Sequence, residues 1–242
     1  MIRFFQPDTG PKIAYRFTKG DGPLIVFLPG YMSDMAGGKA TAVFDWAVAS
    51  GRSCLLLDYS GCGESEGDFK DGTLSCWRDE VLALIDHIGA DKIMLIGSSM
   101  GGWLMLLVGL ALGERLAGLI GIAPAPDFTR WGFTDAQRET IREDGVLRQS
   151  NPYGPEATPT WAGLYDDGVA QEVLGGPIAI HSAVRLLHGQ ADTDVPWKIS
   201  LKLAEALQSN DVRVTLIKDG DHRLSRDADV ALLIDAVAEL AT

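Results

Sequence analysis

The chain has 242 residues, of which 46% are hydrophobic and 22% are charged, so it can bury the core of one or two domains. Its formal net charge of −12 argues against nucleic acid or an anionic membrane surface as a partner, because both require a basic face. The longest apolar stretch, residues 103–112, is too short to cross a bilayer, so we expect no membrane insertion.

Short, mostly apolar runs recur along the chain, and several of them end at glycine, proline or a charged residue. In chain order they are residues 24–28, 54–57, 92–96, 119–123 and 184–187, and a further strand is expected at 212–217. Runs of this length without polar alternation are typical of strands that are buried on both faces, as in a parallel sheet.

Segments with apolar residues at helical spacing lie between or after these runs, at residues 74–85, 199–207 and 230–240. The alternation predicts an α/β fold, in which helices cover both faces of a mostly parallel central sheet. Residues 125–177 do not follow this alternation of strands and helices, and the segment is too long for an ordinary loop between two elements. It contains six aromatic residues, which argue against a disordered insert: Phe128, Trp131, Phe133, Tyr153, Trp161 and Tyr165. We therefore expect one domain over residues 1–242, with an inserted cap at about 125–177.

Residues 93–102 read Ile-Met-Leu-Ile-Gly-Ser-Ser-Met-Gly-Gly, an apolar run that leads into two adjacent serines. Gly97 and Gly101 flank the second serine in the pattern G-x-S-x-G, between a predicted strand and a predicted helix. These glycines remove side chains that would clash in a sharp turn, and the turn holds the Ser99 hydroxyl at a helix N-terminus. Ser99 is therefore the candidate nucleophile, and Ser98 is expected to be a residue of the turn.

A serine hydroxyl needs a general base, and the chain has four histidines. His87 lies near the end of a predicted helix, His181 precedes a strand, and His188 ends one and is expected to be structural. His222 lies in a loop beyond the last predicted strand, which is where a general base is expected in this type of fold. We therefore predict His222 as the base.

The acid that orients the histidine is expected in the loop after the strand at 184–187. This loop offers two carboxylates, Asp192 and Asp194, and its residues alone leave both open. Either one gives the chain order serine, acid, histidine. That order is the one of α/β-hydrolases and differs from the orders in chymotrypsin and subtilisin.

Acyl transfer also requires hydrogen-bond donors for the negative charge that develops on the carbonyl oxygen. The backbone N–H of Met100 directly follows the nucleophile, and a second donor is expected from the loop at 29–34. We predict the N–H of Tyr31 for this role, with Gly30 allowing close approach. Trp131 and Trp161 of the cap are candidates to line the acyl site, although both fit the core of the cap equally well.

These motifs together resemble the α/β-hydrolase superfamily over nearly the whole chain. Residues 58–65 resemble its D-x-x-G-x-G-x-S turn, and residues 188–196 resemble its H-G-x-x-D-x-x-V-P loop, which selects Asp192 over Asp194. Further stretches, at 28–33, 97–106, 185–189, 195–197 and 221–223, resemble the family of α/β-hydrolase domain-containing protein 10. That mitochondrial family includes an acyl-glucuronide esterase and a protein depalmitoylase. The resemblance implies an α/β-hydrolase fold and cleavage of carboxylic esters or thioesters.

The predicted function is that of a serine carboxylic-ester hydrolase, either a carboxylesterase or a thioesterase. It acts on small to medium acyl groups through an acyl-serine intermediate and requires no metal or organic cofactor. An acyltransferase, a lactonase or a perhydrolase uses the same triad and stays an alternative, as does a non-catalytic binding module that kept the fold.

Three scattered cysteines, Cys54, Cys62 and Cys76, indicate a reducing compartment. The N-terminal residues contain neither an apolar signal sequence nor a mitochondrial presequence. We therefore expect a cytoplasmic protein, which is a monomer or a homodimer.

Overall fold

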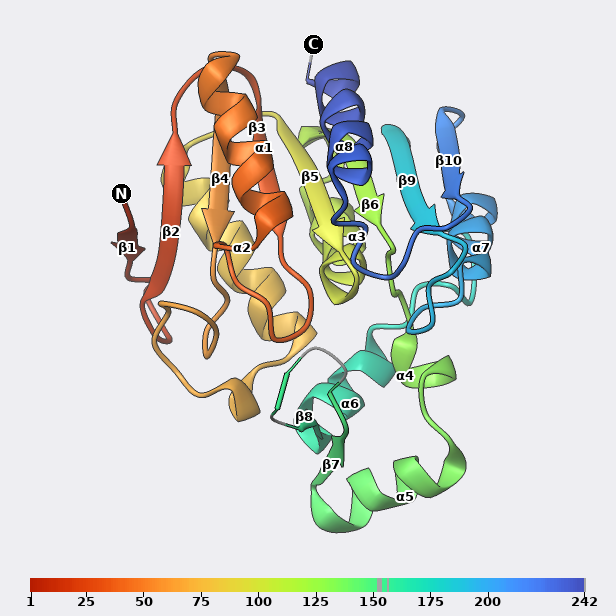
Figure 1. The fold of residues 1–242 in the computed structure, drawn as a ribbon. Helices are drawn as coiled ribbons and strands as arrows, with labels where there is room; N and C mark the ends of the chain where they lie inside the picture. Colours follow the sequence, from red (N-terminus) through yellow and green to blue (C-terminus); the bar gives the residue numbers. More distant parts are fainter. Residues whose placement is uncertain (152–153, 156, 242) are drawn as a thin grey trace.

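The computed structural model describes residues 1–151, 154–155 and 157–241, and a sheet of eight strands forms its centre (Figure 1). The strand order across the sheet is β1-β2-β4-β3-β5-β6-β9-β10. The bounds are β1 (Arg3–Phe5), β2 (Ile13–Thr18), β3 (Asp21–Leu28), β4 (Arg52–Leu57), β5 (Ile93–Ser98), β6 (Leu116–Ile122), β9 (Ala183–Gly189) and β10 (Val212–Ile217). Strand β2 runs antiparallel to β1 and β4, and every other neighbouring pair is parallel. The predicted α/β class with a mostly parallel sheet is confirmed.

Helices cover both faces of this sheet (Figure 1). One face packs against α1 (Gly38–Ala49) and α8 (Asp227–Leu240), and the other against α2 (Leu74–Ile88), α3 (Met100–Leu112) and α7 (Lys198–Ala206). Strand β3 shows why its sequence is apolar without alternation. Leu24, Val26 and Leu28 join the core on the α2 and α3 side. Ile25 and Phe27 point the other way and pack with α1, because side chains alternate along a strand.

Between β6 and β9 the chain leaves the sheet and forms a separate layer. It consists of α4 (Phe128–Trp131), α5 (Asp135–Asp144), β7 (Val146–Gln149), β8 (Thr158–Trp161) and α6 (Ala162–Ala170), with β7 and β8 paired antiparallel. Figure 1 shows this layer beyond the carboxyl ends of the parallel strands. It packs on α3 through Trp103, whose ring meets Phe128 edge-on at 5.3 Å. Tyr153, one of the aromatic residues predicted to belong here, lies outside the described residues.

Short 3₁₀ turns complete the elements, at Phe69–Asp71 and Gly113–Arg115. In the described part of the chain, no helix combines the length and the apolar character that crossing a bilayer requires.

Candidate active site

Ser99 lies in the turn between the end of β5 and the start of α3, with backbone angles φ 54° and ψ −119°. A positive φ is rare for a residue with a side chain and marks a sharp, strained turn. The flanking glycines explain how the chain tolerates it. A Cβ atom on Gly97 would lie 2.3 Å from the carbonyl oxygen of Gly101, and one on Gly101 would lie 2.2 Å from that of Leu28. The turn therefore closes only with glycine at both positions, and it presents Ser99 at the N-terminus of α3.

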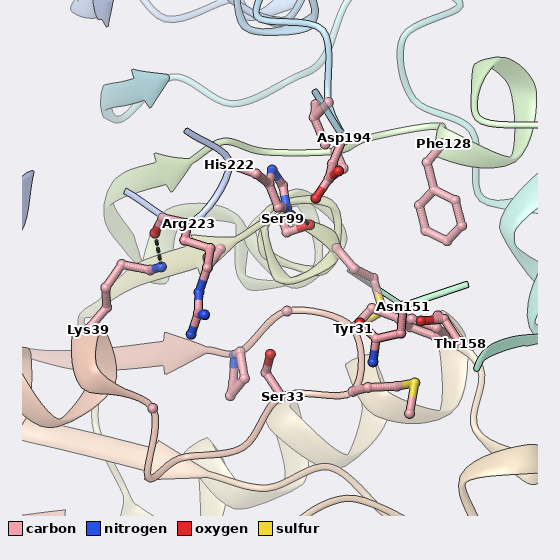
Figure 2. Close-up of a pocket in the computed structure, with 18 of the residues that line it drawn as sticks. Tyr31, Ser33, Lys39, Ser99, Phe128, Asn151, Thr158, Asp194, His222 and Arg223 are labelled. Carbon is pink, nitrogen blue, oxygen red and sulfur yellow. Dashed lines mark hydrogen bonds between the residues drawn. The ribbon is translucent and has the colours of Figure 1, made fainter. Parts of the chain in front are cut away.

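The structure brings Ser99, His222 and Asp192 together, although each comes from a different loop. His222 Nε2 lies 3.0 Å from Ser99 Oγ, and His222 Nδ1 lies 2.8 Å from Asp192 Oδ2. Figure 2 shows the His222 ring facing Ser99. A carboxylate oxygen can only accept, so Nδ1 carries the ring proton and Nε2 is left to accept the serine proton. This is the arrangement that a serine nucleophile and its base require.

Asp192 is held from both sides of its carboxylate. Oδ1 accepts hydrogen bonds from the backbone N–H groups of Asp194 and Val195, each at 2.8 Å. Oδ2 faces His222 and also His188 Nε2, which lies 3.2 Å away. Burial raises the pKa of Asp192, but the hydrogen bonds from His188, His222 and Val195 outweigh it and hold the pKa well below its ordinary value. The carboxylate beside His222 is therefore ionised at neutral pH.

The other three histidines lie away from Ser99. His87 is exposed at the end of α2 and packs its ring on Phe5 at 4.7 Å, and His181 is exposed before β9. His188 is completely buried, and the hydroxyl of Ser200 from α7 lies 2.7 Å from its Nδ1. The sequence indicates a structural role for His188, and Ser200 is not among the residues predicted for the site. The spacing H-G-x-x-D, which puts a histidine four residues before the acid, was the only available signal.

The predicted oxyanion loop approaches the Ser99 turn at Gly30. A Cβ atom on Gly30 would lie 3.2 Å from the carbonyl oxygen of Ser98 and 3.4 Å from the Cβ of Ser99. Tyr31 and Met100, whose N–H groups are the predicted donors, both line the cavity that contains Ser99. The phenol of Tyr31 donates to the carbonyl of Pro159 in β8 at 2.5 Å. This hydrogen bond connects the loop to the layer beyond the sheet.

Residues that directly follow β4 hold the same loop through hydrogen bonds, a role that was not predicted from the sequence. Asp58 accepts from the N–H of Met35 at 2.7 Å, and the Tyr59 hydroxyl donates to the carbonyl of Pro29 at 3.0 Å. Gly63 has a φ of 51°, and a Cβ there would lie 2.2 Å from the Asp58 carboxylate. The D-x-x-G-x-G-x-S turn thus wraps closely around Asp58, which anchors the loop that carries Tyr31.

A cavity of about 760 Å³ opens onto Ser99 and His222. Figure 2 shows Phe128 on one side of Ser99, and Lys39 with Arg223 on the other. Lys39 Nζ donates to the backbone carbonyl of Arg223. Burial, followed by the nearby charge of Arg223, lowers the pKa of Lys39. The cavity therefore has one aromatic end and one end that carries basic side chains.

The two tryptophans predicted for the acyl site separate in the structure. Trp131 lines the cavity, and its indole N–H donates to the carbonyl of Pro126 at 2.9 Å. Trp161 is not among the lining residues, whereas Thr158 and Thr160 of the same strand are. Side chains alternate along β8, so Trp161 points to the opposite face, where the Arg148 guanidinium lies 5.5 Å from its ring centre. Across the described residues, no group of three or more histidine, cysteine or carboxylate side chains is placed to hold a metal ion.

Comparison with curated proteins identifies relatives over almost the full chain. The human protein named "Palmitoyl-protein thioesterase ABHD10, mitochondrial" is 37% identical over 97% of this chain and 78% of its own length. The mouse protein of the same name is 38% identical over 99% of this chain and 82% of its own length. These names contradict the predicted cytoplasmic location, because they place the relatives in mitochondria. Scattered thiols indicate a reducing environment but do not distinguish one reducing compartment from another.

Solved structures and a family model agree with this relationship. A putative hydrolase from Agrobacterium vitis S4 superimposes with a TM-score of 0.93 and 37% identity, covering 100% of both chains. The mouse alpha/beta hydrolase domain-containing protein 10 gives a TM-score of 0.92 and 36% identity, over 99% of this chain and 98% of its own. The model of the alpha/beta hydrolase family matches residues 25–238. The chain therefore belongs to the alpha/beta hydrolase family.

Proposed function

We propose that the protein is a serine hydrolase that cleaves carboxylic ester or thioester bonds through an acyl intermediate on Ser99. The observation that carries this proposal is the unbroken hydrogen-bonded series from Ser99 Oγ through His222 to Asp192, at 3.0 and 2.8 Å, on the wall of a cavity. The names of the curated relatives, which are thioesterases, support the same reaction class.

In the first half of the reaction, His222 Nε2 takes the proton of Ser99 as Oγ attacks the acyl carbonyl carbon. Asp192 then faces an imidazolium and stabilises it through the hydrogen bond to Nδ1. The negative charge moves to the carbonyl oxygen, where the N–H groups of Met100 and Tyr31 are the proposed donors. The N-terminus of α3, which begins at Met100, adds its favourable dipole at the same point.

Collapse of this intermediate breaks the bond to the leaving alcohol or thiol, which takes the proton from His222. The second half repeats the chemistry with water. His222 accepts a proton from a water molecule as it attacks the acyl-Ser99 carbonyl, and the acid is released as Ser99 recovers its proton.

We further propose that residues 125–177 act as a cap within the single domain of residues 1–242. Their Phe128, Trp131 and Phe133 line the cavity, so they offer an apolar surface on which an acyl chain can be buried. Trp131 is the proposed substrate-binding tryptophan, since it borders the cavity directly.

The test compares the variants Ser99→Ala and Ser98→Ala. The two serines are adjacent, but only Ser99 reacts with His222 in the proposed mechanism. Each variant is reacted with a fluorophosphonate probe and assayed on p-nitrophenyl esters and on an acyl thioester. We expect the Ser99 variant to lose labelling and turnover by at least about 10³-fold, the cost of removing a triad member. The Ser98 variant keeps both within about tenfold. Turnover retained without Ser99 contradicts the proposal.

A further inference from the structure

We propose that His188 is a positioning residue for the reaction, which holds the Asp192 carboxylate in place for His222 without touching the substrate. This inference rests on the proposed function. It starts from a second imidazole that contacts the same carboxylate oxygen as the candidate base, since Oδ2 of Asp192 lies 2.8 Å from His222 Nδ1 and 3.2 Å from His188 Nε2.

The contacts of the His188 ring define which nitrogen carries its proton. Nε2 lies 3.1 Å from the carbonyl oxygen of Val195 and 3.2 Å from Asp192 Oδ2, and neither oxygen can donate. Both contacts are attractive only if Nε2 bears hydrogen. In the neutral ring, Nδ1 then accepts from the hydroxyl of Ser200 at 2.7 Å. The two oxygens at Nε2 therefore select the tautomer in which Nε2–H donates to the Val195 carbonyl and lies against the Asp192 carboxylate, and the Ser200 hydroxyl, which can donate or accept, accommodates it.

The two imidazoles belong to different kinds of segment, one to a loop and the other to a strand. Asp192 and His222 lie in loops, after β9 and after β10. His188 is the penultimate residue of β9, where it pairs with Leu216 of β10, and Ser200 belongs to α7. Both His188 and Ser200 are completely buried. The strand and the helix thus fix the ring, and the ring fixes one oxygen of a carboxylate that otherwise depends on loop atoms.

Removal of this donor has two predicted consequences for catalysis. Asp192 loses part of its orientation, so His222 is aligned less well with Ser99. Asp192 also becomes a stronger acceptor toward His222, which favours the protonated, inactive form of the base. Other charges that face this region come from Asp194 on the same loop, Asp221 and Arg223 beside His222, and Lys39 on α1, and none of them is altered by a change at residue 188.

The test compares His188→Leu, which has no donor, with His188→Gln, whose amide nitrogen can reach the position of Nε2. For the leucine variant we expect kcat to fall about tenfold to hundredfold, the value of a hydrogen bond to a charged group. KM stays within about twofold, because His188 does not border the cavity. The acid limb of the kcat/KM profile moves to higher pH by about one unit. The glutamine variant recovers kcat to within about threefold.

The inference is overturned if the leucine variant keeps the wild-type kcat and pH profile. It is also overturned if both variants lose kcat equally while the acid limb stays in place, because that result indicates a purely structural role. Nitrogen-15 NMR of the wild-type protein, labelled at histidine, measures the tautomer of His188 directly and does not require any variant to fold. An Nε2–H tautomer at His188 supports the inference, and an Nδ1–H tautomer overturns it. If the wild-type protein neither binds the fluorophosphonate nor hydrolyses esters, the proposed function fails instead, and the NMR result still reports on His188.

Discussion

Replacement of Asp192 by asparagine removes the charge and turns one acceptor oxygen into a donor, with almost no change in shape. In the native structure all four groups that contact this carboxylate are donors. They are the backbone N–H groups of Asp194 and Val195 at Oδ1, and His222 and His188 at Oδ2. An amide has only one acceptor oxygen. In either orientation, two donors must therefore face its NH₂ group.

The size of the effect follows from this mismatch. Each buried hydrogen bond left unmade costs about 1–3 kcal/mol, so two of them lower the free energy of unfolding by about 2–6 kcal/mol. If the NH₂ group faces His222, the ring is driven to place its proton on Nε2, where it can no longer accept from Ser99. The corresponding substitution in a serine protease lowers kcat about 10⁴-fold, and we expect a decrease of about 10³- to 10⁴-fold for Asp192→Asn.

Steady-state hydrolysis of a p-nitrophenyl ester measures kcat, and urea unfolding measures stability. The matched control is Asp194→Asn, which makes the same chemical change two residues away and keeps the backbone N–H that Asp194 donates to Asp192. We expect the control to lose less than about tenfold in kcat and less than about 1 kcal/mol in stability. A folded Asp192→Asn protein with kcat within tenfold of the wild type refutes the reasoning, because His222 would then be oriented without the carboxylate.

Four further outcomes are expected. Gly97→Ala forces a Cβ atom against the backbone of Gly101, so soluble yield and Tm should fall sharply. Gly163→Ala, with open space around the new atom in α6, should leave Tm unchanged or raise it by a few degrees. Trp131→Ala should lower kcat/KM for long acyl esters about tenfold and Trp161→Ala by less than about twofold; equal losses would contradict the placement of the cavity. The depressed pKa of Asp192 contributes stability above its unfolded pKa of about 3.9, and this contribution is lost as the pH falls through the folded value. Urea unfolding at pH 2–5 measures how the free energy of unfolding depends on pH. We expect this free energy to rise with pH more steeply for the wild type than for Asp192→Asn, by up to about 1.4 kcal/mol per pH unit.

Features that depend on local sequence were predictable. A strand that is buried on both faces is mostly apolar, and therefore the buried parts of β3, β4 and β5 stand out as continuous apolar runs. The Ser99 turn is equally local, since its geometry excludes side chains at Gly97 and Gly101 and leaves a recognisable spacing. The edge strand β1 and its neighbour β2 were not predicted. β1 is mostly exposed and only the first three residues of β2 are buried, so neither strand requires a continuous apolar run.

The sequence by itself determined the α/β class, the Ser99 turn and the order of serine, acid and histidine, because each is encoded within a few consecutive residues or in the order of segments. The residues alone left Asp192 and Asp194 open, and only the folded loop places the Asp192 carboxylate at His222. Tertiary structure also decided that Trp131 borders the cavity while Trp161 does not, since the face on which a short strand places its side chains depends on how the strand is packed. The contact of His188 with the acid, and that of Ser200 with His188, arise in the same way, from a strand and a helix that meet behind the loop. Distances of this kind are set by packing between segments, and no local pattern in the chain records them.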